Sequence, residues 1–169
     1  LIERYLGGEE IPREEVIAAL KTAVVAGSIV PLFVGSATLT FGMRALLTKM
    51  VEIFPAAADV PPPVDAPLLG RVFKTTSEPH VGDVTLFRLY AGTLKNGAAV
   101  WNAEHEVAEK LNHLSVQQGR ERTEVGVLHA GDIGSVAKLR DTHTGDTFCL
   151  RDTPVRLAPI PFPEAVASA

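Results

Sequence analysis

The chain has 169 residues, of which 46% are hydrophobic and 21% are charged. These proportions are typical of a folded globular protein and exclude a disordered tail or a collagen-like fibre. The formal net charge is −4, so no overall basic field indicates nucleic-acid binding, and an RNA contact would need a local basic patch.

Cysteine content and hydropathy favour a cytoplasmic protein without a membrane partner. The single cysteine, Cys149, cannot form an internal disulfide, and the sequence has no Asn-x-Ser/Thr acceptor. The longest apolar stretch, residues 24–35, is shorter than the roughly 20 residues that a membrane span needs. The first residue is Leu1 rather than methionine, and we expect the chain to be a piece of a longer protein.

The first predicted elements are a helix and a short strand. Pro12 suits the first turn of a helix, acidic residues follow it, and Gly27 ends the apolar stripe. Residues 29–34 are a continuous apolar run that is too short for a helix, which predicts a buried strand.

A second helix is predicted before residue 55. Its apolar side chains recur at helical spacing, with Thr40 as the expected N-cap and Pro55 as the stop: Met43, Leu46, Leu47, Met50, Val51 and Phe54. Residues 1–54 are therefore predicted to be helix–strand–helix, a fragment of an α/β sheet that cannot bury both faces of its strand alone.

The pattern changes to β after a linker. Residues 55–66 contain three consecutive prolines, which favour a semi-rigid extended linker. Several β-rich runs separated by turn signals then predict a small barrel rather than a βαβ domain: residues 69–76, 84–91, 98–101, 107–116, 133–139 and 148–150. Residues 158–169 are expected to be extended by their prolines.

No set of residues in the sequence indicates catalysis. The five histidines form no HExxH or other metal pattern, no GxSxG elbow surrounds a serine, and Cys149 lies in an apolar run typical of a core residue. We therefore expect no catalytic residue and no metal site. The histidines are interpreted as solvated or turn residues: His80, His105, His113, His129 and His143.

The tripeptide Gly35-Ser36-Ala37 follows the carboxyl end of the predicted strand. Open α/β sheets bind their ligands at this edge, and small residues let backbone N–H groups approach a planar ligand. A plain strand-to-helix loop is the alternative interpretation.

Several motifs together resemble the translation-factor GTPases, most closely elongation factor G. They occur in the family's order and at compatible distances: Val34-Gly35-Ser36-Ala37, Val81-Gly82, Arg88-Leu89-Tyr90-Ala91-Gly92-Thr93-Leu94, Ala130-Gly131-Asp132-Ile133-Gly134 and Thr144-Gly145-Asp146-Thr147. Residues 1–6 are similar to the helix that precedes the last part of that family's GTPase domain.

The resemblance implies a mainly β chain, a translation-factor-type β-barrel preceded by a helix–strand–helix remnant of an α/β GTPase domain. Residues 1–54 would end the GTPase domain, 55–66 would be the linker, 67–157 the second domain, and 158–169 would lead into a third. Ser36 and Ala37 would recognise guanine through backbone N–H groups. The sequence has no GxxxxGK[ST], Asp-x-x-Gly or Asn-Lys-x-Asp motif, so GTP is expected as a cofactor of the parent protein only, and this chain is not expected to be an enzyme.

The same resemblance implies a parent that couples GTP hydrolysis to movement of tRNA and messenger RNA, with small-subunit ribosomal RNA and the remaining domains of the parent as partners. Cations of the β half are the expected RNA contacts: Arg71, Lys74, Arg88, Lys95, Lys110, Arg120, Arg122, Lys138 and Arg140. Alternatively, they are a solvated barrel face offset by Glu104, Glu106, Glu109 and Glu121. A ribosomal protection protein, a divergent paralogue or a pure inter-domain scaffold are the other functional alternatives.

Overall fold

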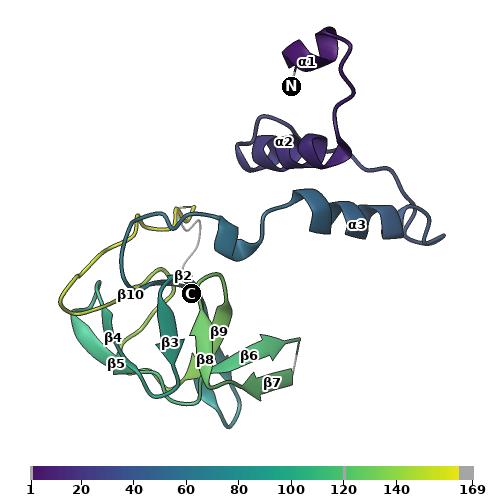
Figure 1. The fold of residues 1–169 in the computed structure, drawn as a ribbon. Coiled ribbons are helices and arrows are strands. Elements are labelled where there is room, and N and C mark those ends of the chain that lie inside the picture. The colour runs from purple at the N-terminus through teal and green to yellow at the C-terminus, as the bar shows by residue number, and fades with distance from the viewer. Residues whose placement is uncertain (1, 120, 164–169) are drawn as a thin grey trace. The chain divides into compact units, whose positions relative to one another are not determined.

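In the computed structural model the chain divides into two compact units, residues 1–60 and residues 61–169, with the division between Val60 and Pro61. The structure describes residues 2–119 and 121–163 (Figure 1). Its described helices include none that is both long and apolar enough to cross a membrane.

The first unit is helical. It contains α1 (Ile2–Leu6), α2 (Arg13–Val25), α3 (Met43–Ile53) and a short 3-10 helix (Ala57–Asp59), so both helices expected from the periodicity are confirmed. Helix α2 follows Pro12 and ends at Ala26, and Gly27 then takes a positive φ of 69°. The prediction of Thr40 as N-cap is wrong: Gly42 caps α3 with φ 78°, and Thr40 lies in the preceding turn with φ 53°.

The strand predicted at residues 29–34 does not form, because this segment has no partner strand. The segment has no regular secondary structure, and Val30, Leu32 and Val34 are each more than 80% exposed. A strand exists only through hydrogen bonds to a neighbour. Within the described residues 2–54 there is no strand to provide them.

The helical unit buries little of its apolar surface. Among its described residues, Ile53 is the one hydrophobic side chain that is buried. Helices α1 and α2 instead face each other across an apolar groove of about 510 Å³, lined by Ile2, Tyr5, Ile11, Val16, Ala19, Leu20, Ala23 and Ile29. Exposed apolar surface of this kind is typical of a face that another part of a protein covers.

The second unit is β. Its strands are β1 (Leu69–Glu78), β2 (Gly82–Ala91), β3 (Thr93–Lys95), β4 (Ala99–Asn102), β5 (Val107–Lys110), β6 (Ser115–Gln118), β7 (Glu121–Glu124), β8 (Val127–His129), β9 (Ile133–Ala137) and β10 (Thr147–Cys149). Eight strands form one antiparallel sheet in the order β5-β4-β10-β1-β2-β9-β6-β7, and β3 pairs with β8. The mainly β expectation is confirmed, although β3, β7 and β8 lie outside the predicted runs.

The run predicted at residues 107–116 is two strands rather than one. Leu111 and Leu114 are fully buried between β5 and β6, and His113 between them has φ 57°. The chain leaves the sheet here so that both leucines enter the core, because burial of two leucines outweighs continuation of a ladder.

The core of the β unit draws on strands from both sheets, as in a barrel. It consists of Leu68, Val72, Phe87, Leu89, Leu94, Val100, Leu111, Leu114, Leu128, Val136 and Phe148. Phe87 and Phe148 meet edge to face with ring centroids 5.5 Å apart. Opposite Phe87 in the β2–β9 register lies Gly134, where an added Cβ would come within 3.0 Å of Phe87 Cζ and 2.3 Å of Leu128 Cδ1. The last glycine of the Ala-Gly-Asp-Ile-Gly motif therefore makes room for the central phenylalanine.

Candidate nucleic-acid interface

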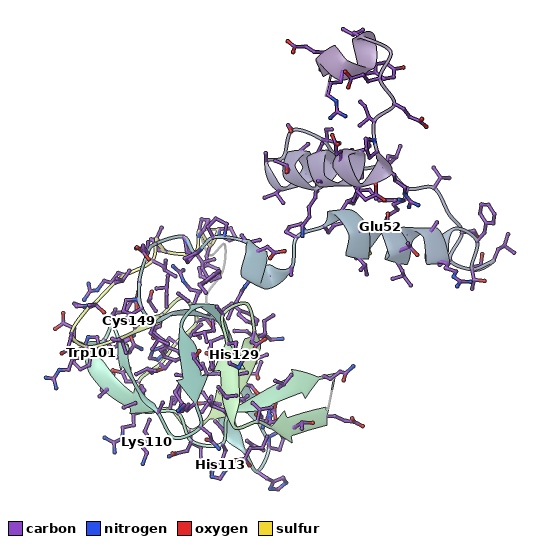
Figure 2. The ribbon with its side chains drawn as sticks, in the orientation of Figure 1. Glu52, Trp101, Lys110, His113, His129 and Cys149 are labelled. Atoms are coloured by element: carbon purple, nitrogen blue, oxygen red, sulfur yellow. The ribbon has the colours of Figure 1, made fainter. Side chains whose placement is uncertain are left out.

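A basic groove of about 530 Å³ lies at one end of the β unit. It is formed by the β1–β2 turn, the β5–β6 connection, β7 and the end of β9. Figure 2 shows Lys110 and His113 at this end. The lining residues are His80, Val81, Lys110, Asn112, His113, Ser115, Arg122, Ala137 and Lys138. Three of the nine expected RNA contacts thus converge on one groove, together with two histidines.

Unusual backbone conformations concentrate in this groove. Five described residues other than glycine have a positive φ, and three of them line the groove: His80 (67°), His113 (57°) and Lys138 (61°). Histidine tolerates this left-handed region better than most residues, but lysine has no such preference. Backbone strain of this kind gathers at functional sites, where the surrounding structure holds a side chain in a required position.

The charge of the groove is partly balanced. Arg122 Nη2 donates to both carboxylate oxygens of Glu78 at 2.9 and 3.1 Å, and His113 Nδ1 lies 3.3 Å from Glu124 Oε1. The Nε of Arg122 is buried and has no hydrogen-bond partner among the described residues. Lys110 and Lys138 are exposed, so two full positive charges remain available to an anion.

Other predicted contacts lie outside the groove. Lys74 on β1, Lys95 on β3 and Arg140 after β9 are exposed. Arg88 on β2 is half-buried, with its guanidinium carbon 5.3 Å from the centre of the Tyr90 ring. Arg120 lies outside the described residues. Of the eight described cations, three therefore line the groove and the other five do not.

The structure places Arg71 in the interior, contrary to its expected role as a surface contact. Its residue exposure is 8%, and its Nη2 donates to the carbonyl oxygen of Ala158 at 2.6 Å. Arg156 adds a bond from Nε to the Ala103 carbonyl at 2.8 Å. Both arginines hold the segment after β10 against the barrel, a structural task that the sequence pattern did not separate from RNA contact.

The expected offsetting carboxylates are also not all solvated. Glu109 is 3% exposed, and it accepts from the backbone N–H groups of Arg140 and Asp141. The Glu104 carboxylate accepts one hydrogen bond from the Thr147 backbone N–H and one from the Thr147 hydroxyl. These side chains bind loops to the barrel rather than balance surface charge.

The Ser36–Ala37 loop is closed on itself in the helical unit. The Ser36 N–H donates to the Phe41 carbonyl at 3.0 Å, and the Ser36 hydroxyl accepts from the Leu39 N–H at 3.3 Å. An added Cβ at Gly35 would lie 2.7 Å from the Phe41 carbonyl oxygen, so glycine is needed for this closure. The Ser36 N–H is therefore already hydrogen-bonded within its own loop.

Sequence comparison identifies the β unit. The family described as elongation factor G domain 2 matches residues 67–151, which is half of the chain. The chain belongs to the elongation factor G domain 2 family. The match covers all ten strands and the basic groove, and it confirms the resemblance drawn from the ordered motifs.

A solved structure supports the same assignment over a longer range. A crystal structure of a protein from Thermus thermophilus is 31% identical, with a TM-score of 0.77 over 96% of this chain. The alignment covers 24% of that protein, so the chain spans about a quarter of the length of this relative. The chain is thus an elongation factor G-like segment with a β-barrel second domain.

Two groove residues, His80 and His113, are absent from the sequence-based set of RNA contacts. Each lies at a turn, after Pro79 and Asn112 respectively. Turn position and tolerance of a left-handed backbone were visible in the sequence. The groove itself was not visible, because its residues come from segments as much as 58 positions apart, from His80 to Lys138.

Proposed function

We propose that this chain is part of a ribosomal translocase of the elongation factor G type, in which the barrel contacts small-subunit ribosomal RNA. The supporting observation is the basic groove, which Lys110, Lys138 and Arg122 line together with two histidines. In the complete protein, GTP hydrolysis would be coupled to movement of tRNA and messenger RNA. The barrel would serve as a contacting and positioning module in the cytoplasm.

The local charge explains how an acidic chain can bind RNA. The whole chain carries −4, and a uniform field of that sign repels phosphate. Exposed lysines in a groove act at short range, where salt screening leaves their attraction largely intact. Each lysine that neutralises one phosphate releases counterions, so its contribution is measured by the salt dependence of binding.

Removal of the two groove lysines is expected to flatten the salt dependence of binding to isolated small ribosomal subunits. The variant Lys110→Gln/Lys138→Gln should lower the slope of log affinity against log salt by about two, one for each lost phosphate contact. Binding is measured by sedimentation across a series of salt concentrations.

The matched control is Lys74→Gln/Lys95→Gln, which removes the same charge from exposed lysines outside the groove. It should leave the slope close to that of the unchanged chain. Equal slopes for the two double variants would show that overall charge rather than the groove determines binding. Absence of small-subunit binding by the unchanged chain would reject the RNA-contact proposal.

Residues 1–54 fit the end of a GTPase domain that is completed by other parts of the parent. The unpaired apolar segment at residues 29–34 and the apolar groove between α1 and α2 are both surfaces that a larger sheet and its helices would cover. Ser36 and Ala37 would then contribute to guanine recognition within that complete domain.

The isolated chain is expected to show no GTP turnover, with or without ribosomes, because it has neither a phosphate-binding loop nor a Mg²⁺-binding motif. The complete parent protein should show turnover that ribosomes strongly stimulate. Release of inorganic phosphate measures both. Turnover by the isolated chain would contradict this prediction, and a silent parent would favour a degenerate paralogue.

A second candidate function is a module that transmits motion between domains. The inward-facing Arg71 and the bond from Leu157 N–H to the Thr147 hydroxyl fix the segment after β10 to the barrel, and three prolines stiffen the other end. The salt dependence of binding distinguishes this function from RNA contact. In a module that only transmits motion, replacement of Lys110 and Lys138 would not change the salt dependence of binding to the small ribosomal subunit. A ribosomal protection protein would use the same groove.

A further inference from the structure

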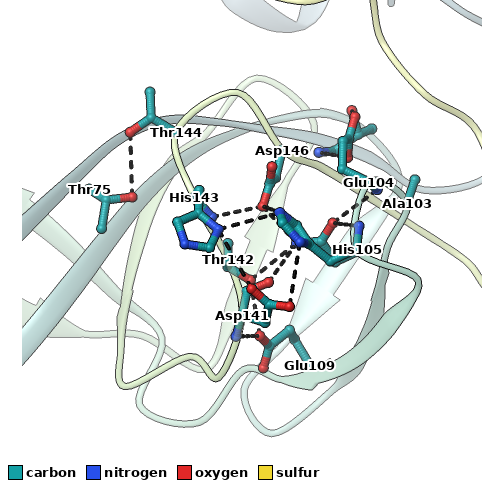
Figure 3. A network of polar contacts seen from close by, with 12 residues as sticks. Thr75, Ala103, Glu104, His105, Glu109, Asp141, Thr142, His143, Thr144 and Asp146 are labelled. Carbon is teal, nitrogen blue, oxygen red and sulfur yellow. Dashed lines mark hydrogen bonds and ion pairs between the residues drawn. The ribbon is translucent and has the colours of Figure 1, made fainter.

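We propose that His105, Asp141 and His143 form a binding site for a divalent transition-metal ion, with zinc as the best match. His105 lies in the β4–β5 turn, and the other two lie in the β9–β10 loop. One ligand atom from each residue lies within 4.8 Å of those from the other two. Figure 3 shows the two imidazole rings facing each other, with Asp141 close to both.

The spacing of the ligand atoms suits tetrahedral zinc. His105 Nε2 and His143 Nδ1 are 3.3 Å apart, and Asp141 Oδ1 is 3.7 Å from His143 Nδ1. Zinc–nitrogen bonds of about 2.0–2.1 Å in a tetrahedron place neighbouring ligand atoms about 3.3–3.4 Å apart. The two histidine nitrogens therefore already have the spacing of zinc ligands, and the Asp141 carboxylate lies close enough to complete a three-ligand site by a side-chain movement.

Asp141 also lies beside the second nitrogen of the His105 ring. Its Oδ2 is 3.4 Å from His105 Nδ1, whereas the other ring nitrogen of His105 is the one that faces His143. Because one carboxylate cannot bind an ion at Nε2 and accept from Nδ1 of the same ring at once, Asp141 would turn from His105 Nδ1 toward the ion when the ion binds. Asp146 Oδ2, 3.4 Å from His105 Nε2, places a second negative charge beside the proposed ion.

The loops that carry these residues are held rigidly by two buried side chains. Asn102 is fully buried, and its amide donates to Asp146 Oδ2 at 2.8 Å and to the Asp141 carbonyl at 3.1 Å. The amide oxygen of Asn102 accepts from the His105 N–H at 3.2 Å. Glu109 accepts from the Asp141 N–H at 2.8 Å. A site fixed before binding loses less entropy when a ligand binds.

The electrostatics of the cluster favour a cation. Asp141 lies within 3.7 Å of a ring nitrogen of both histidines and Asp146 within 3.4 Å of His105 Nε2, and within residues 2–119 and 121–163 no lysine or arginine pairs with either carboxylate. Two imidazole nitrogens and a carboxylate are the borderline donor set that zinc and similar ions prefer over calcium or magnesium. No sequence motif marks this site, because 38 positions separate His105 from His143.

The test is a titration of the untagged chain with Zn²⁺, measured by calorimetry, and with Co²⁺, measured by its visible absorption. One equivalent of Zn²⁺ is expected to bind, and His143→Gln and Asp141→Asn should each weaken binding by at least about tenfold. The side chains of His143 and Asp141 are 66% and 50% exposed, so both variants are expected to fold. His129→Gln is the control, since it removes an exposed histidine on β8 away from this cluster.

The unfolding midpoint of the barrel gives a second measurement of the same binding. Zn²⁺ that binds the folded barrel should raise its unfolding midpoint in proportion to the logarithm of metal concentration, and His143→Gln should require at least about tenfold more Zn²⁺ for the same shift. Absence of stoichiometric binding to the unchanged chain would overturn the proposal. So would an equal loss in His129→Gln, or full binding in both site variants.

Discussion

The variant Phe87→Ala is expected to lower the free energy of unfolding of the β unit by about 3–5 kcal/mol, the usual cost of removing a buried phenyl ring. Phe87 is fully buried and meets Phe148 edge to face at 5.5 Å. Its loss leaves a cavity at the point where β2 and β9 pack around the core, and Gly134 opposite has no side chain to fill the space.

Denaturant unfolding followed by tryptophan fluorescence measures this effect. Trp101, on β4, is the only tryptophan of the chain, so the signal reports on the β unit rather than on residues 1–60. The control is Phe73→Ala, which removes the same ring from a residue on β1 that is 38% exposed. A loss for Phe87→Ala no larger than that for Phe73→Ala would contradict the packing described for the core.

The variant Asn102→Ala is expected to cost about 3 kcal/mol of stability, because it removes several hydrogen bonds at once, one of them to the buried Asp146 carboxylate. The Asn102 amide donates to Asp146 Oδ2 at 2.8 Å, and its oxygen accepts from the N–H groups of Glu104 and His105. Without the Asn102 side chain, the Asp146 carboxylate and the backbone N–H groups of Glu104 and His105 each lose one hydrogen bond.

The control for this variant is Asn112→Ala, at an exposed asparagine after β5. Trp101 fluorescence measures unfolding in both, and amide hydrogen exchange of residues 139–147 shows whether the β9–β10 loop loses protection. An Asn102→Ala chain with unchanged stability and unchanged exchange would show that Asn102 does not tie the two loops together.

Local patterns predicted those elements whose stability is decided within the element. Helix α2 follows directly from Pro12, the early acidic residues and Gly27, and α3 from its apolar spacing. Strands β1, β2 and β9 are long enough for β-branched and aromatic residues to mark them. The ends of the helices were less predictable. The sequence indicated Thr40 as the N-cap of α3, but Gly42 is the N-cap, in a left-handed conformation.

Predictions for residues whose structure depends on a distant segment of the chain were less accurate. Residues 29–34 have the composition of a strand and stay unpaired, since no other strand among the described residues hydrogen-bonds to them. Arg71 looked like any other cation, but its position on β1 buries it below the segment that carries Ala158. In both cases the outcome depends on which distant segment lies alongside, and a one-dimensional pattern does not contain that information.

Local propensity, apolar period and ordered motifs are properties of the amino-acid sequence alone. They were enough to predict the helices, most of the strands and the elongation factor G family. Which polar residues act together depends instead on the packing of the core. Closure of the sheet around Phe87 and Phe148 brings Lys110 to Lys138 in the basic groove and His105 to His143 in the proposed metal site. Both sets join residues from different loops, and the folded core rather than spacing along the chain fixes the distances between them.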